Sequence, residues 1–291
     1  MSDLSVSLGR DARAAFCGAF DAARSSIDAE FFSIDDPVVV DSLNRAAARG
    51  VRVRVTVEGD PHRFRHSAHP REPNDRAVRG GLDASVDVVV SRKPTALVHG
   101  KAAVVDDGVA LIATANVTVT GFGSPGEALV VDRDLDDVRF VRAKIADAAA
   151  SVEHRPDMRP LLADLFRSPC DLRVASEDLS DPKVVAWLVH RARDGHHDRI
   201  LVGRRPSRAG KKWLMRLTDA GIQVRTPERG YMHEKYIDAD TRIYVGSANL
   251  TRDGIDEAHE VGIVADAADF EDGAASLRSY FDSMWGVARP M

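Results

Sequence analysis

The 291-residue sequence is poor in the residues that build extracellular scaffolds and membrane spans. Its two cysteines, Cys17 and Cys170, are too few and too far apart to indicate a disulfide framework or a zinc site. No apolar run approaches the ~20 residues of a membrane helix, and the first residues lack the basic start and apolar centre of a signal peptide. Aromatic residues are only 6% of the chain, without the aromatic-rich amphipathic segment of an interfacial helix. These absences predict a reducing, cytoplasmic environment and no stable membrane association.

The composition is otherwise that of an ordinary globular protein, with 44% hydrophobic and 29% charged residues. The length allows one large domain or two of about 150 residues, each able to bury a core. A net charge of −5 argues mildly against bulk affinity for nucleic acid. Local basic clusters can nevertheless bind phosphates whatever the total charge, so their positions matter more than the sum.

The sequence is organised around a motif that occurs twice. Residues 98–106 read VHGKAAVVD and residues 232–240 read MHEKYIDAD, so both have the form His, any residue, Lys, four residues, Asp. A small hydroxyl residue, an Asn and a Glu follow each motif at nearly equal distances. The two sets are His99, Lys101, Thr114, Asn116 and Glu127, and His233, Lys235, Ser247, Asn249 and Glu260.

A second pair of segments repeats in the same register. Residues 35–50 (DDPVVVDSLNRAAARG) align without a gap with residues 180–195 (SDPKVVAWLVHRARDG). Both have an Asp at the N-cap, a Pro at the first helical position and a terminal Gly, which together predict a helix. The chain therefore contains an internal duplication.

Hydrophobic periodicity predicts alternating strands and helices in both halves, which is typical of α/β sandwiches with mixed sheets. We place the first half at residues 1–155 and the second at 156–291, with residues 151–169 as a proline-containing linker. Residues 61–81 break the pattern and are predicted to form a loop or lid.

Strand parity divides each motif into two faces. His99 and Lys101 point the same way on a strand, whereas Asp106, an odd number of residues from both, points to the other side. The same holds for His233, Lys235 and Asp240, so both aspartates are predicted to be structural, bonding backbone or basic groups. The hydroxyl residue and the Asn of each half are likewise spaced to share a face.

Two such half-sites facing each other would bring two imidazoles, two ammonium groups and two amides around one centre. This set suits a phosphodiester, because Lys and Asn donors stabilise the charge of a pentacoordinate transition state. One imidazole can attack phosphorus while the other protonates the leaving oxygen. Glu127 and Glu260 are candidates to hold Nδ1 of the histidines and fix their tautomers. The scheme requires no metal and no cofactor.

The doubled motif with its downstream residues resembles the phospholipase D superfamily, and the resemblance spans nearly the whole chain. It implies two tandem phospholipase D-like α/β sandwich halves, related by a pseudo-two-fold axis, with one histidine as nucleophile and the other as general acid. By this resemblance His99 is the nucleophile, through a phosphohistidine, and His233 the acid. Thr114 departs from the family, which commonly has Ser at that position.

Two basic segments indicate the substrate. One is the loop at 61–81, and the other is residues 199–217, which contain seven cationic residues and no acid. They either line a groove for a polyanion or form solvated faces. Three histidines of the first segment, His62, His66 and His69, could form a metal cluster, but no carboxylate or cysteine spacing completes it. The cationic candidates for substrate binding are Arg63, Arg65, Arg204, Arg205, Arg208, Lys211 and Lys212.

The leading interpretation is a metal-independent phosphodiesterase that acts as a nuclease on DNA or RNA. One alternative is a phospholipase D or a cardiolipin-synthase-like phosphatidyltransferase. Another is a nucleic-acid-binding component without turnover, with protein partners in a defence or repair complex.

Overall fold

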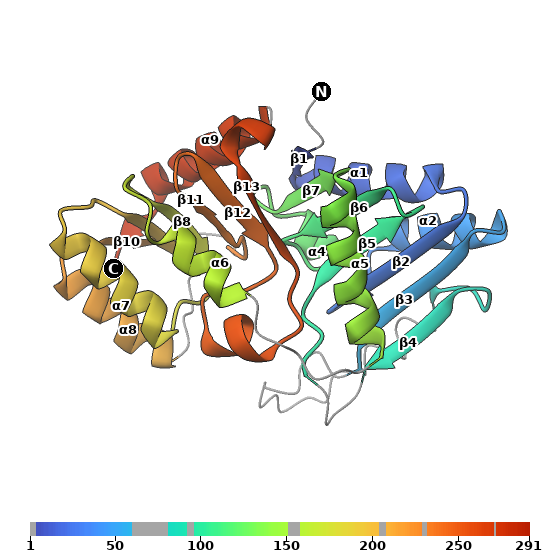
Figure 1. The fold of residues 1–291 in the computed structure, drawn as a ribbon, viewed down its shortest axis with the longest axis horizontal. Helices are drawn as coiled ribbons and strands as arrows, with labels where there is room; N and C mark the ends of the chain where they lie inside the picture. The colour runs from blue at the N-terminus through green and yellow to red at the C-terminus, as the bar shows by residue number, and fades with distance from the viewer. Residues whose placement is uncertain are drawn as a thin grey trace.

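The computed structural model describes residues 4–59, 81–91, 96–150, 158–203, 208–228, 232–270 and 272–291. This part of the chain forms two α/β halves that lie side by side, each built on a seven-stranded mixed sheet (Figure 1). The predicted fold class is therefore confirmed. The boundary predicted between residues 155 and 156 falls outside the described residues.

The first sheet has the order β1-β7-β6-β5-β2-β3-β4. Strands β2, β3 and β4 pair in parallel, and the other neighbours are antiparallel. The strands are β1 (Leu4–Leu8), β2 (Ser26–Phe31), β3 (Arg52–Glu58), β4 (Asp87–Ser91), β5 (Lys101–Val105), β6 (Val109–Ala113) and β7 (Ala128–Asp132).

The second sheet has the order β13-β12-β11-β8-β9-β10-β14, so six of its strands repeat β7 to β4 of the first in the same sequence. The added edge strand differs: β1 lies beside β7, whereas β14 lies beside β10. The strands are β8 (Arg173–Ser176), β9 (Arg199–Val202), β10 (Gln223–Thr226), β11 (Tyr236–Asp238), β12 (Arg242–Gly246), β13 (Gly262–Asp266) and β14 (Arg289–Pro290).

The helices cover both faces of each sheet. Helices α1 and α2 share one core with the first sheet, and α6, α7 and α8 share another with the second. Helices α5 and α9 lie on the faces that the two halves turn toward each other. The helices are α1 (Gly9–Ala22), α2 (Pro37–Ala48), α4 (Val119–Phe122), α5 (Leu135–Ala149), α6 (Met158–Leu165), α7 (Pro182–Arg193), α8 (Arg208–Asp219), α9 (Asp272–Val287), a π-helix η1 (Asp253–Glu257) and a 3₁₀ helix η2 (Ala267–Phe270).

The duplicated helix signals work as the sequence predicts. The Asp36 carboxylate accepts a hydrogen bond from the main-chain N–H of Val38 at 3.0 Å, and the Asp181 carboxylate accepts one from Val184 at 2.9 Å. Such caps satisfy main-chain donors at the start of a helix. Both copies therefore start this helix at the same point, one residue after the Asp.

Two parts of the chain differ from the prediction. Residues 158–165, assigned to the linker, form α6, because Pro160 is tolerated in a first helical turn and Met158, Leu162 and Leu165 bury one face. Strand β1 was not predicted, since its register against β7 depends on a partner strand 120–128 residues away. The loop predicted at 61–81 lies outside the described residues up to residue 80.

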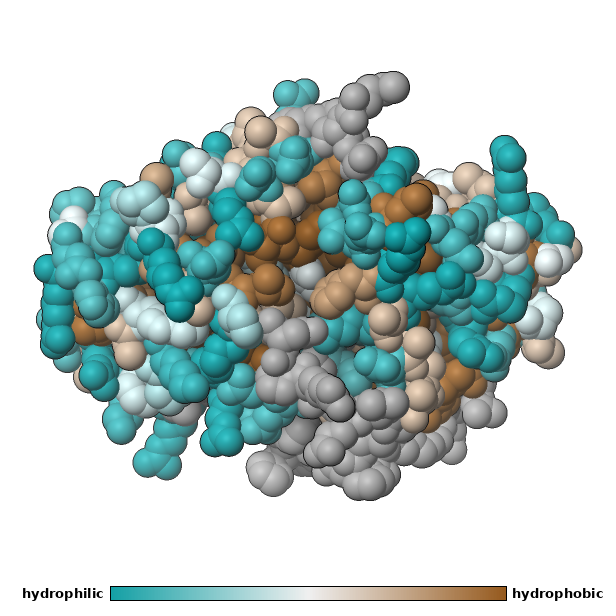
Figure 2. Space-filling model, in the orientation of Figure 1, coloured by the Kyte–Doolittle hydropathy of each residue, from teal (hydrophilic) through white to brown (hydrophobic). Residues whose placement is uncertain are grey.

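The two halves share a hydrophobic core at the seam between them. It combines Val104, Ile112 and Val130 of the first sheet with residues of the second such as Ile243 and Val245. Figure 2 shows apolar residues gathered at the middle of the visible face, over this seam, with hydrophilic residues on both flanks. The halves are thus packed as one body, and the strand ends at the seam are held in fixed positions.

Candidate active site

The first motif is held directly against the second half. Val98 forms a parallel bridge with His259, and the main-chain N–H of His99 donates to the His259 carbonyl at 2.9 Å. From the other side, the Glu58 carboxylate accepts a hydrogen bond from the N–H of Val98 at 3.0 Å. The backbone of the first motif is therefore held by hydrogen bonds from both halves.

Each motif histidine is held by the glutamate of the opposite half. Nδ1 of His99 lies 2.7 Å from Oε1 of Glu260, and Nδ1 of His233 lies 2.8 Å from Oε1 of Glu127. The sequence predicted the glutamates as partners of Nδ1 but did not say which glutamate serves which ring. This reciprocal exchange is the pattern of a two-fold interface, in which residue i contacts j and j contacts i.

The hydroxyl residues stand behind these carboxylates. Thr114 donates to Oε2 of Glu127 at 2.5 Å, and Ser247 donates to Oε2 of Glu260. Parity predicted that each hydroxyl would share a surface with the Asn of its half; both hydroxyls are instead buried and bonded to a glutamate. Each half thus supplies a hydroxyl–carboxylate pair that orients the imidazole of the other half, and the threonine fills this place as the serine does.

The two lysines are fully buried beside their own histidines. Nζ of Lys101 donates to the main-chain carbonyl of His99 at 2.5 Å, and Lys235 makes the same contact with His233. Burial, and to a smaller extent the charge of Lys235, lower the pKa of Lys101 to about 7 against the opposing effect of Glu260. These mutual effects require the two half-sites to lie within electrostatic range of each other.

The protonation of the first half-site follows from its surroundings. Burial lowers the pKa of His99 to about 4, an effect that Glu260 opposes and Lys101 reinforces. Burial also acts to raise the pKa of Glu260, but His99, Lys101 and the Ser247 hydroxyl outweigh it and lower the pKa. At neutral pH the carboxylate is therefore ionised, and a neutral imidazole donates Nδ1–H to it. Nε2 of His99 is then left with a lone pair.

The two asparagines are also placed alike. The side-chain oxygen of each, Asn116 and Asn249, is buried and has no hydrogen-bond partner among the described residues. Nδ2 of Asn249 lies 3.3 Å from Oε2 of Glu177. A buried amide oxygen without a partner can accept a hydrogen bond from a bound ligand.

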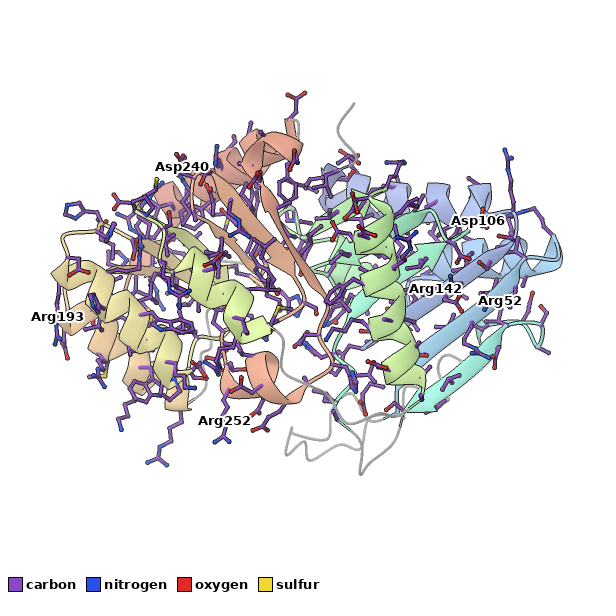
Figure 3. The ribbon with its side chains drawn as sticks, in the orientation of Figure 1. Arg52, Asp106, Arg142, Arg193, Asp240 and Arg252 are labelled. Atoms are coloured by element: carbon purple, nitrogen blue, oxygen red, sulfur yellow. The ribbon has the colours of Figure 1, made fainter. Side chains whose placement is uncertain are left out.

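The aspartates of both motifs lie outside this centre, as parity predicted. The Asp106 carboxylate accepts main-chain N–H groups of Arg24, Ser25 and Ser26 at 2.7–3.0 Å. Burial alone raises its pKa, but these donors outweigh burial and lower it to about 2. Asp240 lies 3.9 Å from the guanidinium of Arg278. Figure 3 places Asp106 and Asp240 in different halves and far from each other.

The predicted substrate-binding residues are only partly described. Arg208, Lys211 and Lys212 lie exposed at the start of α8, which follows β9. Strands β8 and β9 are parallel, so their C-terminal ends lie at the same end of the sheet. Glu177 follows β8 at that end. The arginines at 63, 65, 204 and 205 and the histidines at 62, 66 and 69 lie outside the described residues.

Two side chains that the sequence analysis did not select contact the motif residues. The ring of Phe32 meets His99 edge-on, with centroids 4.8 Å apart, and lies 5.2 Å from Nζ of Lys101. Oε2 of Glu177 lies 3.5 Å from Nε2 of His233 and 3.7 Å from Nζ of Lys235. The gap-free alignment of residues 35–50 with 180–195, extended by three residues, already pairs these two positions.

A buried carboxyl lies behind each motif, but it comes from different positions. In the first half it is Glu30 on β2, whose Oε1 lies 1.4 Å from where a Cβ on Gly100 would be. In the second half it is Glu234 of the motif itself, and the β8 position equivalent to Glu30 is Ala175. Burial raises the pKa of Glu30 to about 8, with Glu260 adding to the rise; burial likewise raises the pKa of Glu234 to about 7, with Glu127 adding to it.

Within the described residues, no group of three or more His, Cys, Asp or Glu side chains is placed to hold a metal ion. Nor is any helix in the described ranges both long and apolar enough to cross a bilayer.

Both halves of the chain match one protein family. The model described as "Cardiolipin synthase, PLD-like domain" matches residues 16–147 and 162–285, one match in each half. The chain belongs to the phospholipase D superfamily. Members of this superfamily are generally enzymes of the phosphodiesterase type. No curated protein matches the sequence significantly.

Solved structures resemble this phospholipase D-like chain in fold. Phosphatidylserine synthase of Haemophilus influenzae Rd KW20 aligns with a TM-score of 0.70 at 12% identity, covering 99% of this chain and 87% of that one. Polyphosphate kinase of Porphyromonas gingivalis aligns with a TM-score of 0.65 at 15% identity, over 97% of this chain and 46% of that one. The chain thus spans less than half of the kinase. At these identities the likeness concerns the fold.

Proposed function

We propose that this chain is a phosphodiesterase that cleaves nucleic acid through a phosphohistidine. The observation that carries the proposal is the reciprocal pairing of His99 with Glu260 and of His233 with Glu127. A carboxylate on Nδ1 fixes the ring tautomer and leaves Nε2 of each imidazole for chemistry.

The reaction takes two steps. In the first, Nε2 of His99 bonds to phosphorus while the P–O bond to the leaving group breaks, and His233 gives its proton to the leaving oxygen. In the second, a water oxygen attacks phosphorus, the P–N bond breaks, and His233 takes the proton of that water. Splitting the displacement this way, with an acid that becomes a base, is the usual logic of covalent catalysis.

The remaining residues stabilise charge or hold the imidazoles. Lys101 and Lys235 supply positive charge, and the amides of Asn116 and Asn249 supply hydrogen bonds to the non-bridging oxygens. Such donors are each typically worth about 3–4 kcal/mol in the transition state. Thr114 and Ser247 act through the glutamates, which makes them positioning residues.

Nucleic acid is favoured as substrate by the cationic start of α8, where Arg208, Lys211 and Lys212 are exposed. A run of cations without acids attracts a polyanion, and the binding it gives weakens steeply as salt rises. Phosphatidyl transfer is the second candidate, favoured by the family description and by the likeness in fold to a phosphatidylserine synthase.

One panel tests both candidates. Labelled single- and double-stranded DNA, RNA, and vesicles of phosphatidylglycerol are incubated in EDTA with wild type, His99→Ala and His233→Ala. Cleavage of a nucleic acid by wild type and its loss in His99→Ala support the proposal. Action on the vesicles alone favours phosphatidyl transfer, and nucleic-acid cleavage that survives His99→Ala contradicts the phosphohistidine.

A further inference from the structure

The two halves place different residues at one equivalent position beside the motif. In the first sheet Phe31 pairs with Lys101, and in the second Ala175 pairs with Tyr236, so Ser176 stands opposite the position of Lys235. The next residues along the chain are Phe32 and Glu177. Each lies four residues before the aspartate that caps the following helix, so the register is the same by sequence and by strand pairing.

The first position is closed by an aromatic ring. Phe32 touches His99 edge-on and lies over the ammonium of Lys101. In the described part of the chain, the carboxylate that pairs with His99 is Glu260, at Nδ1. A hydrocarbon edge can neither accept a proton from the imidazole nor hold one on Nε2.

The second position carries an acid among donors. Oε2 of Glu177 lies 3.3 Å from Nδ2 of Asn249, 3.5 Å from Nε2 of His233 and 3.7 Å from Nζ of Lys235. Its main-chain carbonyl accepts the N–H of Gly203 at 3.0 Å, and a Cβ on Gly203 would lie only 2.4 Å from that oxygen. The backbone at Glu177 is therefore closely packed, whereas its side chain is 27% exposed.

The imidazole of His233 consequently lies between two carboxylates. Glu127 faces Nδ1 at 2.8 Å and Glu177 faces Nε2 at 3.5 Å. A carboxylate oxygen therefore lies near each ring nitrogen, and a ring that carries both protons can direct one toward each. Among the described residues, Lys235 also faces this Glu177 oxygen, at 3.7 Å, and Lys101 lies within electrostatic range of Glu177.

We propose that Glu177 makes the two histidines unequal: it holds a proton on Nε2 of His233, so that His233 serves as the acid and His99, beside Phe32, as the nucleophile. This inference rests on the proposed phosphodiesterase function and deepens it. Glu177 stays ionised in both steps and acts through His233, which makes it a positioning residue. Its oxygen also occupies the donor set that a phosphate oxygen needs, so it competes with substrate for Lys235 and Asn249.

The leaving group separates this role from a purely structural one. Bis(p-nitrophenyl) phosphate releases p-nitrophenolate, which needs no proton, whereas an oligonucleotide releases an alkoxide that does. For Glu177→Gln we expect kcat on a single-stranded oligonucleotide to fall about 10- to 100-fold, part of the 10²–10⁴ that an acid supplies. On bis(p-nitrophenyl) phosphate kcat should change less than about twofold, and KM should fall for both substrates because a competing charge is gone.

Two controls calibrate this pattern. In the first turnover His233→Ala should show the same dependence on leaving group more strongly, although the later water step slows for both substrates. His99→Ala should abolish release from both substrates. Phe32→Leu, at the equivalent position, should not separate the two substrates. Equal slowing of both substrates in Glu177→Gln overturns the inference while leaving the phosphodiesterase intact. Absence of p-nitrophenol release by wild type overturns the proposed function, and the inference with it.

The exchange variant gives the sharpest readout. In Phe32→Glu/Glu177→Phe the phosphate trapped by alkaline quench and located by peptide mass spectrometry should move from His99 to His233. Circular dichroism and the melting temperature establish that the variant is folded. A folded exchange variant that still traps phosphate on His99 overturns the assignment.

Discussion

The two half-sites share their framework and differ in what surrounds it. Both hold a histidine by a glutamate from across the seam, and both back that glutamate with a hydroxyl. They differ at Phe32 against Glu177, and at Gly100 with Glu30 against Glu234 with Ala175. Duplication has therefore kept the groups that orient the imidazoles, while the groups that set their charge have diverged.

The largest effects on kcat should come from replacing the two glutamates that bind a histidine of the opposite half. Glu260→Gln keeps the side-chain volume but removes the charge that fixes Nδ1–H of His99, so we expect kcat to fall at least about 100-fold. Glu127→Gln should cause a similar loss on an oligonucleotide but spare the first-turnover release of p-nitrophenolate from bis(p-nitrophenyl) phosphate, because that leaving group needs no proton from His233. The later water step, in which His233 is the base, should slow for both substrates, so burst rates of the first turnover measure the difference. If both variants slow both substrates equally, the assignment of His99 as nucleophile and His233 as acid is contradicted.

The two halves place their buried carboxyl at different positions, Glu30 in the first and Glu234 in the second. Adding a side chain where the first half has Gly100 should lower the free energy of unfolding by about 1–3 kcal/mol, since overpacking a buried site costs that much. In Gly100→Ala the new Cβ would fall 1.4 Å from Oε1 of Glu30, so the variant should unfold at lower denaturant. Glu30→Ala/Gly100→Glu copies the second half and should recover most of the loss. Urea unfolding monitored by circular dichroism gives the difference, and Gly108→Ala, at an open turn, is the matched control.

The same carboxyls should give stability a pH dependence. Burial raises the pKa of Glu30 to about 8, above its ordinary 4.5, so the folded chain holds a proton there that the unfolded chain loses. Stability should therefore decline as pH rises from about 4.5 to about 8, by at most ~1.4 kcal/mol per pH unit for one group.

Glu30→Gln removes this contribution, so the stability of the variant relative to wild type should increase across that pH range. For Glu234→Gln the increase should end near pH 7. Urea midpoints at pH 5, 6, 7 and 8 measure both curves. A difference that stays constant with pH would show that Glu30 is ionised in the folded protein.

The smallest effect is expected at the hydroxyls. Thr114→Ser keeps the donor to Glu127, so its rate should stay within about threefold of wild type, whereas Thr114→Val keeps the shape, loses the hydrogen bond and should cost about tenfold. Ser247→Thr and Ser247→Ala are the corresponding pair in the second half. If Thr114→Ser and Thr114→Val behave alike, the hydroxyl does not orient Glu127.

Features set by short-range rules could be predicted from the sequence. The capped helices after Asp36 and Asp181 and the exclusion of Asp106 from the centre follow from local spacing and strand parity. The order of strands and helices, which repeats in the two halves, likewise predicts the two-half α/β fold.

Features set by distant partners could not be predicted. The exchange of glutamates across the seam, the register of β1 against β7 and the exclusion of the Thr114 hydroxyl from the open surface depend on how the halves dock. The difference between Phe32 and Glu177 was readable in the alignment of the two copies. That Glu177 acts on a motif histidine could be inferred only from the structure, in which its Oε2 lies 3.5 Å from Nε2 of His233.

The core shared at the seam makes the chain one thermodynamic unit. Residues of both sheets bury one another there, so neither half keeps its apolar face covered once the other unfolds. Melting should be a single cooperative transition, and catalytic competence should disappear along the same curve. In a chain with only one half folded, the histidine of that half would have lost its carboxylate partner. We therefore expect a partly folded molecule to have no catalytic activity.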